Sequence, residues 1–205
     1  MIALFVDTSI SFPTISLVKD NEVLFKFHSE IKSDMSSKIL SIIDEALNNS
    51  NLSLKSIDKI FTVTGPGSFT GVRIGVTIAK TIAWSLNIPV IPISSLEYMA
   101  TTQTNKKYIV SMIDARRGNV FAGIYNNELE CVKKDSLINK DELFDDLNED
   151  YLLLSYDTIE NAVHPSPDVL KIINKYKNEV GVNPHQLKPN YLKLTEAEEN
   201  RLKND

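Results

Sequence analysis

The stretch at residues 61–96 constrains the fold of this chain more than any other, because it joins a strand, a glycine-rich turn and a long apolar helix. β-Branched and aromatic residues before the turn are typical of a buried strand. Gly65, Pro66 and Gly67 predict a sharp reversal, since glycine adopts positive φ without steric cost and proline fixes its own φ. A helix is predicted at 70–86, followed by a short strand and the start of another helix.

The helix predicted at 70–86 is apolar around most of its circumference, whereas a surface helix normally has one apolar stripe. We therefore expect it to be covered on two sides. The side assigned to the domain's own core comprises Ile74, Ile78, Ile82 and Ser85. The side assigned to a binding partner comprises Val72, Val76, Ala79 and Ala83, with Gly75 for close backbone approach and Arg73 as the polar contact.

A second broad apolar stripe is predicted on a helix at 34–49. Its partner-binding residues are predicted to be Met35, Ile39, Ile42 and Ala46. Apolar faces of adjacent helices associate as bundles, and a stable interface buries about 800 Å² per partner. The two helices together therefore predict a protein–protein interface, either with another protein or with a second copy of this chain.

The glycine-rich turn also suggests an anion site, because a helix N-terminus offers free amide groups and a positive dipole end. Its spacing matches neither the dinucleotide fingerprint nor the P-loop, since Gly71 arrives one residue late for the first and no lysine follows it for the second. Pro66 also removes one amide donor. The local sequence thus favours a turn that lets strand and helix pack closely.

Charge and cysteine content narrow the classes of function. The 205 residues carry a formal net charge of -5 and few arginines, which disfavours direct nucleic-acid binding as the main role. The single cysteine, Cys131, excludes an internal disulfide and fits a reducing compartment. The start of the chain does not resemble a signal peptide, and no apolar run reaches the length of a membrane span. A cytoplasmic protein is expected.

The second half of the chain begins like the first, with a strand ending in aspartate, a polar turn and two further strands. Asp114 takes the place of Asp7 in this alignment. The pattern suggests a duplicated lobe. We predict an N-terminal lobe at 1–102, which carries the partner-binding helices, and a smaller C-terminal lobe at 103–205. A last helix, predicted at 196–203, is available to pack back on the first lobe.

Three segments supply candidate contacts for a ligand or nucleotide. They are Asp7, Thr8 and Ser9 after the first strand, Gly67 and Ser68 in the glycine-rich turn, and Asp114 and Arg116 in the second lobe. The alternatives are that the first group forms a turn that satisfies nearby amides, and that the last pair forms a structural ion pair. Arginine suits carboxylate or phosphate, so a ligand contact also stays open.

Several motifs together resemble the TsaB family. They are VDTS at 6–9, GPGSFTGVRIG at 65–75 followed by IPVIPISSLEYMA, IDARRG at 113–118 and PNYLK at 189–193. The resemblance implies an α/β, two-lobed fold of the actin, sugar-kinase and Hsp70-ATPase superfamily, with a reduced second lobe. It also implies a non-catalytic subunit required for threonylcarbamoyladenosine formation on tRNA. In the superfamily, the position of Asp7 carries an acidic residue that meets Mg²⁺ and phosphate.

The resemblance implies that this chain lacks the metal site of the catalytic relative, TsaD. That relative carries His-x-x-x-His after the GPG unit, where two imidazoles hold a metal. Ser95 and Met99 align with these positions, and Glu97 between them is explained by helix capping after Ser94. We therefore predict no metal, no cofactor of its own and no catalytic residue. The alternative is a stand-alone ATPase or phosphotransferase, but the second phosphate loop that such an enzyme needs is missing.

The same resemblance implies the partners. The two apolar stripes would bind TsaD, and in its absence a second copy of this chain. TsaE would join in a larger complex, tRNA would be met only through the complex, and no membrane is involved. A nucleotide at the shared interface stays open.

Overall fold

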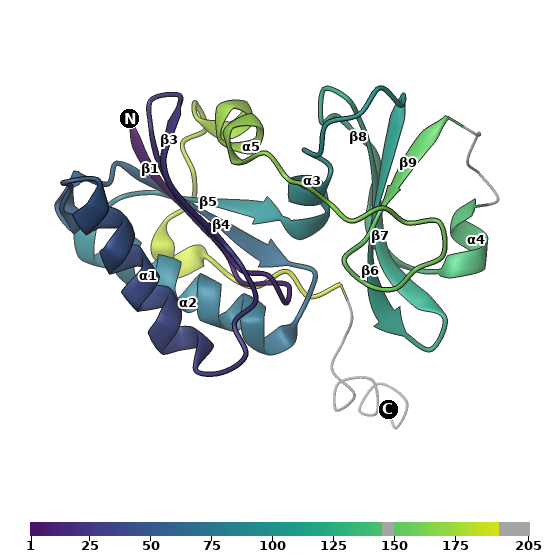
Figure 1. Ribbon diagram of the computed structural model, residues 1–205, viewed down its shortest axis with the longest axis horizontal. Helices are drawn as coiled ribbons and strands as arrows, with labels where there is room; N and C mark the ends of the chain where they lie inside the picture. Colours follow the sequence, from purple (N-terminus) through teal and green to yellow (C-terminus); the bar gives the residue numbers. More distant parts are fainter. Residues whose placement is uncertain (145–149, 193–205) are drawn as a thin grey trace.

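The computed structural model describes residues 1–144 and 150–192, which form two β-sheets side by side (Figure 1). The first sheet has the order β3-β2-β1-β4-β5, with β4 parallel to β1 and to β5. Its strands are β1 (Ile2–Asp7), β2 (Thr14–Lys19), β3 (Glu22–His28), β4 (Lys59–Gly65) and β5 (Val90–Ser94). We call this sheet and its helices the first lobe.

The second sheet has the order β8-β7-β6-β9, with β9 parallel to β6. Its strands are β6 (Tyr108–Arg116), β7 (Asn119–Asn126), β8 (Cys131–Asn139) and β9 (Tyr151–Leu154). We call this sheet the second lobe. It repeats the antiparallel meander and parallel fourth strand of the first lobe, as the sequence pattern predicts. The division of the chain at residue 102 into two domains stays a prediction.

The helices are distributed unequally between the lobes (Figure 1). Two long helices cover one face of the first sheet, whereas the second sheet has one short helix. The remaining helices lie between the lobes or on their border. The helices are α1 (Met35–Asn49), α2 (Phe69–Leu86), α3 (Ser95–Met99), α4 (Lys140–Phe144) and α5 (Val169–Tyr176), with short 3-10 turns η1 (Leu54–Ser56) and η2 (Pro184–Gln186).

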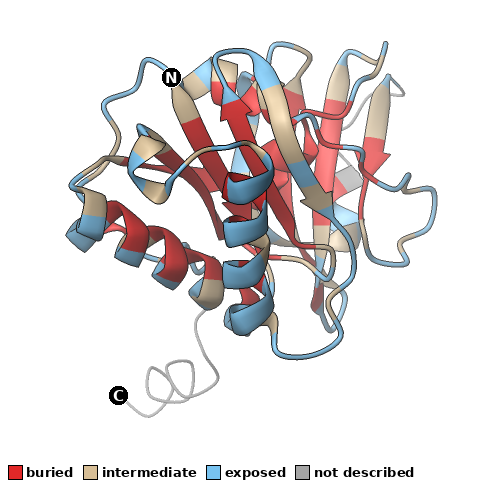
Figure 2. Ribbon diagram, turned by 60° about the vertical axis from the view of Figure 1, so that its left-hand side comes forward, coloured by how far each residue is buried: buried red, intermediate tan, exposed pale blue. Residues whose placement is uncertain are grey.

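One hydrophobic cluster joins the two lobes. It contains Phe5 and Phe61 from the first sheet, Met99 from α3, Ile109 from β6 and Ile172 from α5, all buried. A second cluster lies between the first sheet and helices α1 and α2. Figure 2 shows the buried residues concentrated in the strands and along one side of a long helix. The link between the lobes begins with two buried residues, Thr101 and Thr102, whose hydroxyls accept hydrogen bonds from the amides of Asp168 and Ser166.

The assignment of the faces of α2 from sequence is wrong. The residues predicted to meet a partner are 4% exposed or less and pack on the first sheet: Val72, Val76, Ala79 and Ala83. The physical reason is that a helix lies closest to a sheet along its smallest side chains, so the alanines mark the inner face. Gly75 likewise faces inward, against the Thr8 hydroxyl. Of the predicted core face, Ile78 and Ile82 are also buried, but Ser85 is exposed.

The stripe predicted on α1 is partly wrong for the same reason. Ile39 and Ala46 are fully buried against the sheet, while Met35 and Ile42 are half-buried. Leu40, on another side of α1, is 52% exposed. The outer surface of the helix pair therefore consists of residues other than most of those predicted.

The last described segment returns to the first lobe. Val182 pairs with Val90 at the edge of β5, and the Asn190 amide donates to the Thr64 carbonyl at 2.7 Å. The helix predicted at 196–203 lies outside the described residues. Among the described helices, none is both long and apolar enough to cross a membrane.

Candidate functional site

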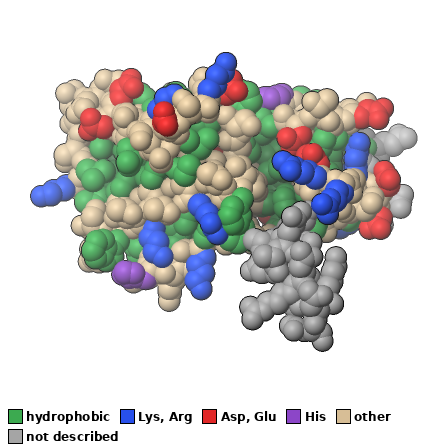
Figure 3. Space-filling view, turned by 90° about the horizontal axis from the view of Figure 1, so that it is seen from below, with side chains coloured by type: hydrophobic (Ala, Val, Ile, Leu, Met, Phe, Trp, Pro, Cys, Tyr) green, Lys and Arg blue, Asp and Glu red, His purple; other side chains and the backbone are tan. Residues whose placement is uncertain are grey.

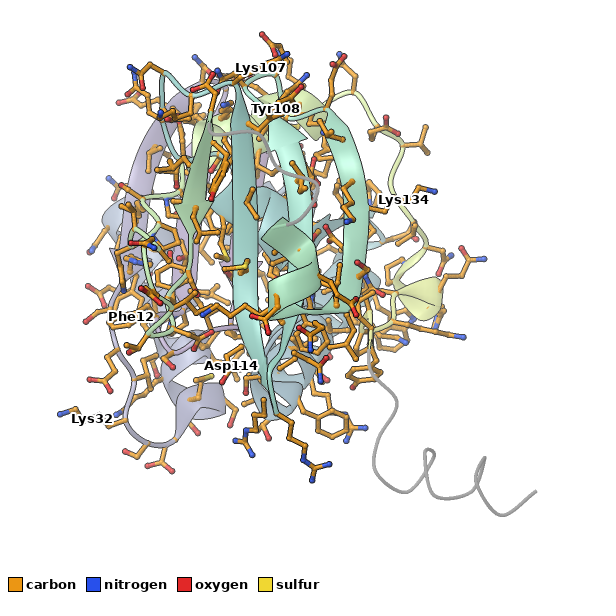
Figure 4. The ribbon with its side chains drawn as sticks, turned by 90° about the vertical axis from the view of Figure 1, so that its right-hand side faces the viewer. Phe12, Lys32, Lys107, Tyr108, Asp114 and Lys134 are labelled. Carbon is orange, nitrogen blue, oxygen red and sulfur yellow. The ribbon has the colours of Figure 1, made fainter. Side chains whose placement is uncertain are left out.

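A cleft of about 620 Å³ lies between the lobes and gathers most of the ligand contacts predicted from sequence. Ser9 comes from the loop after β1, Gly67 and Ser68 from the glycine-rich turn, and Asp114 and Arg116 from the end of β6. In Figure 4 the labelled Phe12 and Asp114, which also line the cleft, lie toward the same end of the molecule. Asp7 and Thr8 are buried and are not among the lining residues.

Asp7 is held beneath the cleft with its carboxylate out of solvent. It is 2% exposed, and its Oδ1 accepts hydrogen bonds from the Ser9 amide at 2.8 Å and the Ser9 hydroxyl at 2.7 Å. Burial raises the pKa of Asp7 to about 6, because desolvation outweighs these two hydrogen bonds. The structure therefore contains the turn that the sequence analysis gave as the alternative to a ligand contact, with the Asp7 carboxylate accepting the hydrogen bond of a nearby amide.

The glycine-rich turn packs directly on the loop after β1. The Ser68 amide donates to the Ser9 carbonyl at 2.7 Å, and the Thr8 hydroxyl donates to the Gly71 carbonyl at 2.6 Å. A Cβ atom at Gly67 would lie 2.4 Å from the Ser9 carbonyl oxygen, and one at Gly71 would lie 2.0 Å from the Thr8 carbonyl oxygen. Close packing of strand and helix therefore accounts for these glycines, as the local sequence favours.

The second-lobe wall of the cleft is organised by two carboxylates. Asp114 Oδ1 accepts from the Arg116 amide at 2.8 Å, and the Asp114 amide donates to Asp157 Oδ2 at 2.7 Å. Asp114 and Arg116 are thus joined through the backbone of a turn in which Arg116 and Arg117 have positive φ. Two carboxylates facing a single lining arginine make this wall poorly suited to a polyphosphate.

An aromatic cluster beside the cleft joins the lobes and is not predicted by any motif. The ring of Phe12 lies 6.1 Å from those of His28 and Tyr156, and His164 meets Tyr156 edge-on at 4.8 Å. His28 Nδ1 lies 2.8 Å from the Thr14 hydroxyl, and burial lowers the pKa of His28. The histidines are 136 positions apart (164 minus 28), so no local signal could have brought them together.

Ser95 and Met99, which align with the two metal ligands of the catalytic relative, are both engaged in contacts within the protein. The Ser95 hydroxyl donates to the Pro66 carbonyl, and Met99 is 2% exposed within the core. No group of three His, Cys, Asp or Glu side chains that could hold a metal occurs in residues 1–144 and 150–192. The prediction that the protein binds no metal stays a prediction.

Glu97 has a different role from the one predicted. The cap of α3 is Ser94, whose hydroxyl accepts from the Leu96 and Glu97 amides. The Glu97 carboxylate, 7% exposed, instead accepts from Lys175 Nζ at 2.5 Å and from the Tyr176 hydroxyl at 2.7 Å. The capping pattern missed this pair because both partners lie on α5, far along the chain.

Comparisons with known proteins place the chain beside tRNA-modification proteins. Residues 29–193 match the family described as TsaD, tRNA N6-adenosine threonylcarbamoyltransferase. The tRNA threonylcarbamoyladenosine biosynthesis protein TsaB of Bacillus subtilis is 35% identical, with 97% of this chain and 96% of that protein aligned. The protein of the same description from Buchnera aphidicola (subspecies Schizaphis graminum) is 33% identical over 72% of this chain and 73% of that protein.

The fold is shared with a solved structure. A Pseudomonas aeruginosa protein, described as uncharacterized with similarity to peptidase YEAZ, superposes with a TM-score of 0.80 at 21% identity, covering 94% of this chain and 99% of that one. The two-lobed α/β fold with a smaller second sheet is confirmed. Membership of the actin, sugar-kinase and Hsp70-ATPase superfamily stays an expectation from the resemblance.

Proposed function

The chain belongs to the TsaB family of tRNA threonylcarbamoyladenosine biosynthesis proteins, and from this premise we propose that it is a non-catalytic subunit that binds and activates TsaD. The observation that carries the proposal is the state of positions 95 and 99. A serine bonded to the Pro66 carbonyl and a buried methionine replace the two histidines of the catalytic relative. Neither side chain replaces imidazole as a metal ligand.

The surface proposed for TsaD is the solvent side of α1 with the flank of α2 that carries Ile74 and adjoins α1, rather than the stripes predicted from sequence. Leu40 is 52% exposed, and Met35, Ile42 and Ile74 are half-buried in the single chain. Apolar side chains left partly in water on two adjacent helices favour association with a further helical surface. The same surface would serve for a homodimer of the chain alone, and TsaE would join the assembled pair.

The stand-alone ATPase is the competing function. The cleft is retained, but the second phosphate loop is replaced by a turn closed on Asp114, and two carboxylates line that wall. These features favour the subunit over the ATPase. A nucleotide at the interface with TsaD remains part of the proposal.

Reconstitution tests the proposal. The purified chain alone should neither turn over ATP nor modify tRNA, whereas adding TsaD, TsaE and the threonylcarbamoyl adenylate should give modified adenosine, measured by nucleoside mass spectrometry. Leu40→Glu should lower both complex formation, measured by light scattering, and modification. Glu128→Lys, exposed and in the second lobe away from α1, is the charge-change control. Full modification by TsaD and TsaE without this chain would refute the proposal.

For Asp7 we propose a role in fold and assembly rather than in catalysis. Asp7→Ala should lower modification only as far as it lowers complex formation. A complex that forms fully while modification collapses would assign the carboxylate a direct chemical role.

A further inference from the structure

Aromatic and basic side chains, all exposed except the half-buried Lys80, form a stripe along one flank of α2. The stripe comprises Phe69, Arg73, Lys80 and Trp84 of α2, together with His185 and Tyr191 of the segment that returns to the first lobe. Trp84 is 62% exposed, Tyr191 45% and Phe69 43%. Soluble monomers seldom leave three large rings this exposed on one surface, so the stripe is a candidate binding surface.

The stripe is held in place by contacts between α2 and the returning segment. Arg73 Nε donates to the Tyr191 hydroxyl at 2.9 Å, and its guanidinium carbon lies 3.8 Å from the centre of the Phe69 ring. The Phe69 and Tyr191 rings stack at 5.1 Å. At the other end, Lys80 Nζ donates to the His185 carbonyl at 3.2 Å, and the His185 ring meets Trp84 edge-on at 6.3 Å. The rings and cations are therefore ordered before any partner binds.

The stripe is basic although the protein is acidic. No aspartate or glutamate occurs at 59–96 or at 180–195, the two segments that supply it, in a chain with 27 acidic and 22 basic residues. Lys188, exposed, lies between His185 and Tyr191 in the chain and adds a third cation to Arg73 and Lys80. Figure 3 shows this underside, where Lys and Arg side chains and a histidine lie among hydrophobic side chains over α2, while acidic side chains lie toward the upper edge and the second lobe.

We propose that this stripe binds an unpaired segment of RNA, with bases stacked on Trp84 and on the Phe69–Tyr191 pair and with phosphates at Arg73, Lys80 and Lys188. Exposed rings interleaved with cations are the recurrent surface for unpaired nucleotides, because each base has a face for stacking and each phosphate a negative charge. The inference rests on the proposed function, which provides a tRNA as the substrate of the assembly. An acidic protein segment would use the cations but leave the ring faces without partners, so RNA is favoured.

The three cations of the stripe determine how strongly RNA binding should depend on salt concentration. Three cations on a single strand predict a slope of log K against log salt of roughly -2, and affinity that is weak for the chain alone. The contact would therefore orient an RNA that the assembly holds mainly elsewhere. This agrees with the small arginine content, which argues only against RNA binding as the main role of the chain.

Fluorescence anisotropy with the full chain tests the proposal. The probe is a fluorescein-labelled RNA stem–loop with an unpaired purine-rich loop, compared with a fully paired RNA duplex and with poly-L-glutamate as competitor. Trp84→Ala should weaken binding about tenfold, the loss expected for one stacked base. Arg73→Gln should weaken it several-fold and reduce the salt slope by about 0.7. Lys107→Gln is the matched control, because it removes a cation that also lies beside an aromatic ring, 5.0 Å from that of Tyr108, but outside the stripe. Lys107 lies in the second lobe, at the end of the sheet opposite Asp114 (Figure 4).

Three outcomes would overturn the proposal. They are binding that neither stripe variant changes by more than twofold, competition by polyglutamate as effective as that by unlabelled stem–loop, and equal binding of the duplex. Co-purification of each variant with TsaD separates this test from the proposed function. If Trp84→Ala abolishes pairing with TsaD, the stripe is a protein interface and the RNA proposal fails. If pairing with TsaD is absent in wild type as well, the proposed function fails while the RNA measurement still decides the stripe.

Discussion

The first strand of each lobe carries an aspartate at or near its end with the same local hydrogen bond, yet the two carboxylates have opposite surroundings. Asp7 accepts the amide of Ser9 and Asp114 accepts the amide of Arg116, each two residues on and each at 2.8 Å. Asp7 is 2% exposed, whereas Asp114 is exposed and lines the cleft. The difference arises after the fourth strand: β4 leads into the glycine-rich turn and α2, while β9 leads into an irregular segment.

This comparison teaches that a repeated strand pattern fixes the position of a side chain but not its chemistry. The helix that follows the fourth strand decides whether the aspartate is buried, because its first turn packs on the loop after β1. Among the described residues of the second lobe, no helix directly follows the fourth strand, and Asp114 is exposed. Four matched pairs of substitutions test how closely each part of the molecule is packed.

The largest effect is expected from a charge on the inner face of α2. Val76 is 4% exposed against the first sheet, so Val76→Glu should destabilise the protein by more than about 4 kcal/mol. Urea unfolding followed by circular dichroism measures this, and Thr77→Glu, exposed on the same helix, should change stability by less than about 0.5 kcal/mol. A folded Val76→Glu monomer would restore the partner-facing assignment made from sequence.

Next in size is the tight turn of the first lobe. Gly71→Ala should cost about 3 kcal/mol, because the new Cβ would lie 2.0 Å from the Thr8 carbonyl oxygen in a rigid contact. The second-lobe turn offers the contrast. Gly118→Ala should cost only about 1 kcal/mol, because its φ of +76° disfavours alanine while nothing lies within 4 Å of the added atom. Equal losses in urea unfolding would contradict the view that only the first turn is sterically closed.

The ion pair at the border of the lobes should have a smaller effect. Lys175→Met removes the cation that bonds Glu97, whose side chain is 9% exposed, and we expect a loss of about 2 kcal/mol because the Lys175 side chain is itself 31% exposed. The matched variant Lys106→Met removes the pair with Asp150, whose side chain is 59% exposed, and should cost less than about 0.5 kcal/mol. Thermal unfolding of both variants provides the comparison, and similar losses would show that the Glu97 pair is not specially placed.

The smallest effect is a gain in stability. The pKa of Asp7 is raised from 3.8 to about 6, so the folded protein keeps a proton that the unfolded chain has released, and stability falls as the pH rises from about 4 to about 6. Asp7→Asn keeps an acceptor for Ser9 and should gain about 1 to 2 kcal/mol at pH 7 with a flatter profile below pH 6. Asp114→Asn, at an exposed position, should change stability at pH 7 by less than about 0.5 kcal/mol. A loss of stability in Asp7→Asn at pH 7 would mean that the charge is compensated in the folded state.

The sequence predicts the parts of this molecule that depend on local pattern. The repeated meander, the glycine-rich turn and the cap at Ser94 follow from residue spacing. The cleft is not predicted, although most of the candidate ligand contacts line it. The inner face of α2 could not be assigned, since an apolar helix offers more than one candidate face and only the approach to the sheet selects among them. The Glu97–Lys175 pair and the His28–His164 cluster join distant segments, and no spacing rule reaches so far.

The segment that returns to the first lobe has a consequence for how the protein is made. Lys59 Nζ bonds the carbonyls of Lys177 and Glu179, which lie 118 and 120 positions later, and Asn190 completes the hydrogen bonding of Thr64. At the usual pace of synthesis, roughly 10 s separate the two halves of these contacts on the ribosome. The nascent first lobe therefore waits with an open edge at β5, and a ribosome stalled late in the message would release a chain that lacks its closing segment.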